Sequence, residues 1–163
     1  MHKYAEEFAK GKKPKMPDDE NAKNGVLGFL RWIEDAGLEL KYPEKHVYSK
    51  KYDYAGIVDV DARRKKKLVV VEYKTSNGIY DEHRYQAAAQ QQALEEMTGK
   101  KYDERWLAHF DKNTGEFRAI LLDEFEKDMK AFLGCIAIRN RAEDLKYRAS
   151  QEKHVQGLTQ GLL

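Results

Sequence analysis

The chain has 163 residues, and its 30 Lys and Arg against 28 Asp and Glu leave a formal net charge of +2, although 36% of the residues are charged. This balance excludes a protein that is cationic throughout, and the single Cys135 excludes a disulfide framework and a cysteine-ligated iron–sulfur cluster. A mean hydropathy of −0.85, with no long apolar run and no signal-like start, excludes a membrane span and predicts an intracellular, cytoplasmic protein.

Hydrophobic periodicity predicts one domain over residues 1–150 and a C-terminal tail over 151–163. The expected elements, in chain order, are a helix over 1–10, a helix between Asp18 or Asp19 and Gly37, strands over 45–50, 54–61 and 68–71, a helix over 82–97, strands over 105–110 and 116–121, and a last helix after Asp123. The order ααβββαββα predicts an α/β (α+β) fold in which helices pack on a mixed sheet.

The segment from Gly56 to Lys74 carries the candidate chemistry. Folded as an antiparallel hairpin that turns at 64–67, it would place position 61 opposite 70 and Asp59 opposite Glu72. Glu72 and Lys74 share a face because strands have a period of two, so two carboxylates and one ammonium would meet. The same register would gather an apolar face from Val58, Val60, Val69, Val71 and Tyr73.

Two carboxylates at cross-strand distance, about 4.5–5.5 Å, repel each other unless a cation lies between them. Mg²⁺ typically binds through one or two carboxylates together with substrate phosphate, and Lys74 would orient an attacking water. The pattern therefore predicts metal-assisted hydrolysis of phosphodiesters. The alternative is a solvated cross-strand salt bridge, against which the three valines before Glu72 indicate a central strand.

Two motifs in this segment resemble those of the PD-(D/E)XK nuclease superfamily, in its RecB-like and lambda-exonuclease-like branch. The run from Tyr54 to Asp59 resembles the YAG-(I/T/V)-x-D signature, and the run from Val71 to Ser76 resembles the (D/E)-x-K-T-S strand. The resemblance implies a restriction-endonuclease-like αβββαβ core.

The same resemblance implies the site residues. Asp59, Glu72 and Lys74 would be catalytic, and the metal, one or two ions of Mg²⁺ or Mn²⁺, would be held by Asp59, Glu72 and the main-chain carbonyl of Tyr73. The branch also has a helix motif, G-x-x-x-H-x-x-x-E, whose His binds metal, and His2 to Glu6 resembles its second half. A solvated terminal histidine is the alternative for His2.

Three further residues match the superfamily less closely. Gln86 stands at the position of a Gln on the helix after the ExK strand, and Gln90 replaces the Tyr usual four residues later; both are expected to contact the substrate. Glu44 resembles a Glu that lies before the first of these strands, in some relatives near the metal. The remaining histidines, His83 and His109 among them, lack ligand spacing and are predicted to be surface or packing residues.

Basic residues cluster in the predicted hairpin loop, where Arg63, Arg64 and Lys65 are expected to contact a phosphate backbone near the site. The alternative is a solvated turn. A looser basic patch on the last helix consists of Arg139, Arg141, Lys146 and Arg148.

The predicted function is a metal-dependent deoxyribonuclease with little sequence preference, acting as an exonuclease or on single strands and duplex ends. Its expected setting is DNA recombination, repair or phage DNA processing in a bacterial or phage-like context, beside a helicase or recombinase. Two alternatives stay open. One is a structure-specific endonuclease of the junction-resolvase type, which implies a homo-oligomer; the other is an inactive relative that only binds nucleic acid.

Overall fold

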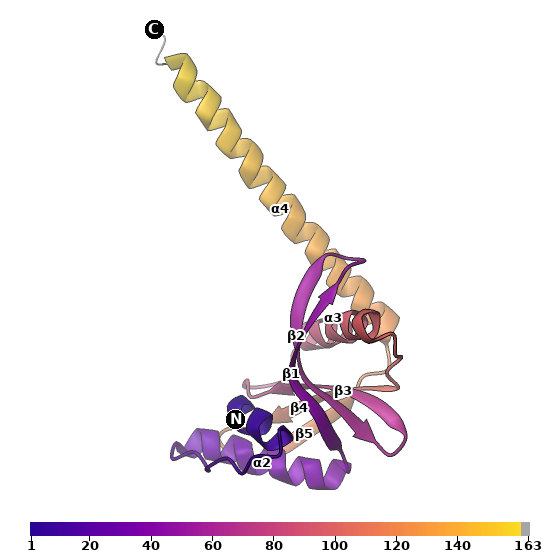
Figure 1. The fold of residues 1–163 in the computed structure, drawn as a ribbon. Helices are drawn as coiled ribbons and strands as arrows, with labels where there is room; N and C mark the ends of the chain where they lie inside the picture. The colour runs from indigo at the N-terminus through magenta and orange to yellow at the C-terminus, as the bar shows by residue number, and fades with distance from the viewer. Residues whose placement is uncertain (161–163) are drawn as a thin grey trace.

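Four helices and five strands form the part of the chain that the computed structural model describes, the backbone of residues 1–160 and the side chains of 1–151 (Figure 1). They are α1 (His2–Ala9), α2 (Glu20–Ala36), β1 (Glu39–Ser49), β2 (Tyr54–Arg64), β3 (Lys67–Lys74), α3 (Asp81–Thr98), β4 (Glu104–Phe110), β5 (Phe117–Leu121) and α4 (Phe125–Gln160). The predicted order ααβββαββα is confirmed. Helix α2 begins as expected, since the Asp19 side chain accepts a hydrogen bond from the Ala22 N–H at 2.8 Å.

The strands form one mixed sheet in the order β1-β2-β3-β4-β5. Neighbouring strands are antiparallel except β3 and β4, which are parallel. A parallel pair needs a crossover connection, and α3 supplies it between β3 and β4. The predicted fold class, a mixed sheet flanked by helices with an αβββαβ core, is therefore confirmed.

Helices cover both faces of this sheet (Figure 1). On one face α1 and α2 bury Phe29 and Trp32 against Tyr73 and Phe110, whose rings meet with centroids 5.6 to 6.0 Å apart. On the other face α3 packs a stripe of small residues that includes Ala93. Because both faces of β3 are buried, its central residues form a continuous apolar run.

Strand β2 separates from β3 halfway along its length. The ladder between them includes the predicted pairs 63–68 and 61–70 but ends at Val60–Val71, whereas β2 stays paired with β1 as far as Tyr54. Asp59 and Glu72 are therefore not a ladder pair, contrary to the prediction. The prediction that Val58 shares the face of Val60 is also wrong, because Val58 packs in the cluster under α3.

Helix α4 runs past the predicted boundary at residue 150 and continues to Gln160; residues 161–163 of the predicted tail lie outside the described chain. Its first turns are fixed to the domain by an ion pair from Asp128 to Arg105 and by Phe132, whose ring lies 4.9 Å from that of Tyr54. Beyond Ile136 every described side chain is exposed, and Figure 1 shows the helix extending away from the sheet. None of the described helices is both long and apolar enough to cross a bilayer.

The end of α3 is tied to the following loop by the buried carboxylate of Glu95, which predicts a pH-dependent stability. Glu95 accepts hydrogen bonds from Gln91 Nε2 and from the Tyr102 N–H, both at 3.0 Å, and pairs with Lys101. Burial alone would raise the pKa of Glu95, but these hydrogen bonds and Lys101 outweigh it and lower the pKa. A lowered pKa in the folded state stabilises the protein above the unfolded value and loses that effect as the pH falls through the folded value.

We therefore expect Glu95→Gln to lower the free energy of unfolding by about 1–2 kcal/mol at pH 7, with the difference from the parent protein shrinking below about pH 4.5. Urea unfolding at a series of pH values measures this. Glu143→Gln, on the exposed part of α4, is the matched control and should show no such difference. A gap between Glu95→Gln and the parent that stays constant down to pH 3 would contradict the prediction.

Candidate active site

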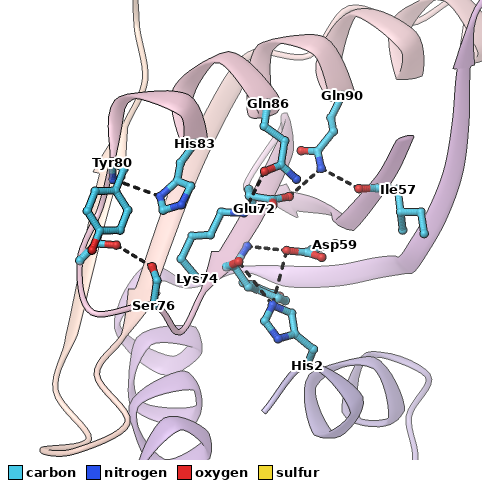
Figure 2. Close-up of polar contacts among 12 residues, drawn as sticks. His2, Ile57, Asp59, Glu72, Lys74, Ser76, Tyr80, His83, Gln86 and Gln90 are labelled. Atoms are coloured by element: carbon cyan, nitrogen blue, oxygen red, sulfur yellow. Dashed lines mark hydrogen bonds and ion pairs between the residues drawn. The ribbon is translucent and has the colours of Figure 1, made fainter. Parts of the chain in front are cut away.

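The predicted acidic and basic residues meet where β2 and β3 separate (Figure 2). Asp59 Oδ2 accepts a hydrogen bond from the Tyr73 N–H at 2.6 Å, which holds the carboxylate against β3 although the ladder has ended. Lys74 Nζ donates to Glu72 Oε1, also at 2.6 Å. The separation therefore does not disperse the cluster, because Asp59, Glu72 and Lys74 still lie close together where the strands part.

This cluster is buried and carries an excess of negative charge. The side chains of Asp59, Glu72 and Lys74 are 17%, 3% and 16% exposed. Burial, and then the negative charge of Glu72, raise the pKa of Asp59 well above its ordinary range, against the opposing effects of the Tyr73 N–H and Lys74. Two carboxylates in such surroundings hold either a proton or a cation between them.

The donor atoms in the cluster fit a hard divalent cation. Asp59 and Glu72 offer carboxylate oxygens, and the carbonyl of Tyr73 lies between the two strand positions that carry Glu72 and Lys74. Mg²⁺ prefers such oxygen ligands and keeps several waters, and Mn²⁺ accepts the same set. Within residues 1–151, no three side chains of His, Cys, Asp or Glu converge as a metal-binding group, so waters or substrate oxygens would complete the coordination.

His2 lies beside the cluster, and its role as a metal ligand stays a prediction. Helix α1 places His2 Nε2 3.3 Å from the Tyr73 carbonyl oxygen and 3.9 Å from Asp59 Oδ2. Glu6, on the next turn, forms an ion pair with Lys10. Of His2 and Glu6, only His2 makes a contact with a site residue in the described chain.

Gln90 bridges the two separating strands. Its Nε2 donates to Glu72 Oε2 at 2.7 Å and to the Ile57 carbonyl at 2.6 Å (Figure 2). The residue is 4% exposed, and its Oε1 has no hydrogen-bond partner among the described residues. This burial is incompatible with the predicted contact between Gln90 and substrate, so the residue orients Glu72 instead.

Replacing Gln90 by leucine should test this orienting role. The variant leaves Glu72 Oε2 and the Ile57 carbonyl without their donor, and we expect a 10–100-fold loss in metal affinity or cleavage, as is common when a partner of a ligand is removed. The measurement is the cleavage rate as a function of Mg²⁺ concentration. Gln92→Leu, two residues along α3 and bonded to Glu96, is the control; an unchanged metal dependence in Gln90→Leu would refute the role.

Gln86 lies on the exposed side of the cluster. Its Oε1 accepts a hydrogen bond from Lys74 Nζ at 2.9 Å. Lys74 therefore has two acceptors, Glu72 and Gln86, and one of its three N–H bonds is left for another partner. This arrangement points the ammonium group between the carboxylates and the surface.

His83 is a neighbour of the site that sequence reasoning assigned to the surface or to packing. Its Nδ1 accepts a hydrogen bond from the Tyr80 N–H at 3.1 Å, and it stands above Lys74 (Figure 2). Burial, followed by the charge of Lys74, lowers the pKa of His83, which favours the neutral ring with its proton on Nε2. The sequence could have placed His83 near the site, because His83, Gln86 and Gln90 stand at i, i+3 and i+7 and therefore share one helix face.

Other predicted residues lie away from the site. Arg63 and Arg64 lie at the end of β2 and Lys65 in the turn that follows, four to six residues along the chain from Asp59, or roughly 13–20 Å. Arg64 donates to the Ala36 carbonyl at 3.1 Å, so it helps to fix α2. Glu44 is exposed, with φ 49°, and makes no hydrogen bond or ion pair with the site within the described chain.

Comparison with known proteins gives only distant likenesses. No protein-family model matches the sequence, and no curated protein does. Among solved structures, the alkaline exonuclease LHK-Exo from Laribacter hongkongensis is 15% identical, with a TM-score of 0.47 over 91% of this chain and 84% of that one. The same enzyme in complex with dAMP is also 15% identical, with a TM-score of 0.46 over 91% and 85% of the chains. A likeness at this distance carries no conclusion about activity.

Proposed function

We propose that this chain is a metal-dependent deoxyribonuclease that hydrolyses phosphodiester bonds with little sequence specificity. The observation that carries the proposal is the meeting of Asp59, Glu72 and Lys74 at the point where β2 leaves β3. A buried carboxylate pair with one ammonium is costly to maintain as a purely structural feature, whereas it suits a cation and a phosphate. The two sequence motifs that resemble PD-(D/E)XK nucleases fall on these residues.

In this proposal Asp59, Glu72 and the Tyr73 carbonyl hold Mg²⁺ or Mn²⁺. When bound, the cation supplies a Lewis acid for the phosphate and lowers the pKa of a bound water. The chain's own contribution is orientation. The Tyr73 N–H fixes the Asp59 carboxylate, and Gln90 fixes that of Glu72, so both carboxylates are set before substrate arrives.

Lys74 has the electrostatic role. Hydrogen bonds to Glu72 and Gln86 hold its ammonium in one place, and its remaining N–H would hold the attacking water or a phosphate oxygen. Negative charge that develops at the phosphate would meet this fixed positive charge in a partly desolvated setting, where such interactions are strongest.

The exposed groups beside Lys74 would contact a DNA strand without reading its sequence. Gln86 and His83 are single polar side chains on one face of α3, and isolated donors of this kind contact phosphate and sugar oxygens. We propose action on single strands or duplex ends, in line with the branch that the motifs resemble.

The test uses the purified chain with linear duplex, linear single-stranded and closed circular DNA in Mg²⁺, Mn²⁺ or EDTA. We expect metal-dependent loss of linear DNA, and circular molecules that stay intact. Cutting of circles would replace end-directed action by endonuclease activity. If neither metal supports cleavage of any substrate, the proposed enzymatic function is refuted.

A further inference from the structure

Helix α4 carries two apolar stripes on opposite sides. The first packs against the domain and consists of Phe125, Met129, Phe132, Leu133 and Ile136. The second, which we call the outer seam, consists of Cys135, Ile138, Ala142, Leu145 and Ala149. At about 100° per residue the two stripes are centred roughly 140° apart. The outer seam is therefore not a continuation of the domain-packing stripe.

The outer seam is exposed along its length. Ile138 is 74% exposed and Leu145 50%, and Cys135 is exposed as well. Figure 1 shows that this part of α4 extends beyond the sheet and the other helices. Because the seam faces away from the stripe that docks α4, a small bend of the helix would not bring it onto its own domain.

The spacing of the seam is that of a helix–helix contact. Its five residues follow one another at intervals of three, four, three and four, the a and d positions of a heptad repeat. Larger Ile138 and Leu145 alternate with small residues, which lets a neighbouring helix approach closely. The helix after Ile136 is about 36 Å long at 1.5 Å per residue, and helices in proteins are stabilised mostly by packing of an apolar face.

Basic side chains line both edges of the seam. Arg139 and Lys146 occupy the e positions, and Arg141 and Arg148 occupy the g positions. Acidic Glu143 and Asp144 lie further round the helix. Two copies of α4 packed through this seam would place positive flanks against positive flanks, which opposes self-association.

We infer that α4 binds an acidic amphipathic helix of another protein through the outer seam. Apolar side chains of the partner would cover Ile138 and Leu145, and Asp or Glu on its edges would pair with the four basic residues. DNA would satisfy the charges but leave the apolar seam in water. A membrane surface would suit a broader apolar face with aromatic residues, whereas Tyr147 lies on the opposite side of the helix.

The probe is a synthetic helical peptide with Leu in its seam and Glu on both flanks, titrated against the full chain by fluorescence anisotropy. We expect saturable binding that weakens as salt rises, and no binding of the matched peptide with Lys on its flanks. The double variant Ile138→Ser/Leu145→Ser should lose about tenfold or more in affinity. Tyr147→Ser, an exposed ring on the other side, is the control and should bind normally.

A charge reversal on both edges gives the sharper result: Arg139→Glu/Arg141→Glu/Lys146→Glu/Arg148→Glu should weaken binding of the Glu peptide and allow binding of the Lys peptide. Duplex DNA and anionic vesicles are tested in parallel, with the oligomeric state followed by sedimentation. The inference is overturned by no binding of the Glu peptide, by binding that Ile138→Ser/Leu145→Ser leaves intact, or by self-association through the seam. It is equally overturned if the binding of DNA or vesicles, and not the binding of the peptide, depends on these residues. None of these outcomes bears on whether the chain cleaves DNA.

Discussion

Replacing Lys74 by methionine is expected to reduce DNA cleavage about a hundred- to thousandfold, the usual effect of removing one group that stabilises developing charge. Methionine keeps most of the length of the side chain and removes the ammonium that contacts Glu72 and Gln86. The metal ligands in the proposal, Asp59, Glu72 and the Tyr73 carbonyl, are unchanged, so metal binding should persist. Loss of cleavage with retained metal binding separates a catalytic role from a ligand role.

Single-turnover cleavage, thermal unfolding and Mn²⁺ binding followed by electron paramagnetic resonance measure the three properties of Lys74→Met. Lys130→Met is the matched control, because this exposed lysine of α4 contacts no site residue in the described part of the chain and the substitution removes the same charge. Equal losses in the two variants would indicate a general effect of net charge. Full cleavage by Lys74→Met would remove Lys74 from the proposed mechanism.

The sequence was sufficient to predict the residues that form the cluster. A β-branched run fixes β3, the period of two puts Glu72 and Lys74 on one face, and the short hairpin brings β2 alongside. These are local rules, and they hold because the strands are long and buried. The proximity of Asp59 and Glu72 follows from them even though the ladder ends one pair earlier than expected.

What could not be predicted depends on long-range geometry. Separation of β2 from β3 is stabilised by Gln90, a residue of α3 whose two acceptors are 18 and 33 residues away in the chain. The basic loop was expected near the site because it joins the two site-bearing strands. In a hairpin, however, the turn and the open end lie at opposite ends of the strand pair. Arg63 lies near the turn, whereas Asp59 lies beyond the last ladder pair.

The second large expected effect concerns stability and the buried ion pair between Arg105 and Asp128. Arg105 Nη2 donates to Asp128 Oδ2 at 2.5 Å, and the two side chains are 2% and 8% exposed. Asp128→Ala would leave the guanidinium buried without its counter-ion, and its Nε already lacks a partner among the described residues. We therefore expect a loss of about 3–5 kcal/mol in the free energy of unfolding, measured in urea.

A double variant separates the cost of the unpaired charge from the loss of packing. Arg105→Met/Asp128→Leu removes both charges and keeps much of the volume, so it should recover most of the stability that Asp128→Ala loses. Lys127→Ala, which breaks the exposed pair with Glu124 on the same turn of α4, is the control and should cost far less than Asp128→Ala. If the double variant were as unstable as Asp128→Ala, the pair would stabilise the docking of α4 on β4 directly, and the uncompensated charge would not be the cause. If Asp128→Ala cost no more than Lys127→Ala, the buried pair would contribute little, and the apolar contacts of Met129 and Phe132 alone would hold α4 to the domain.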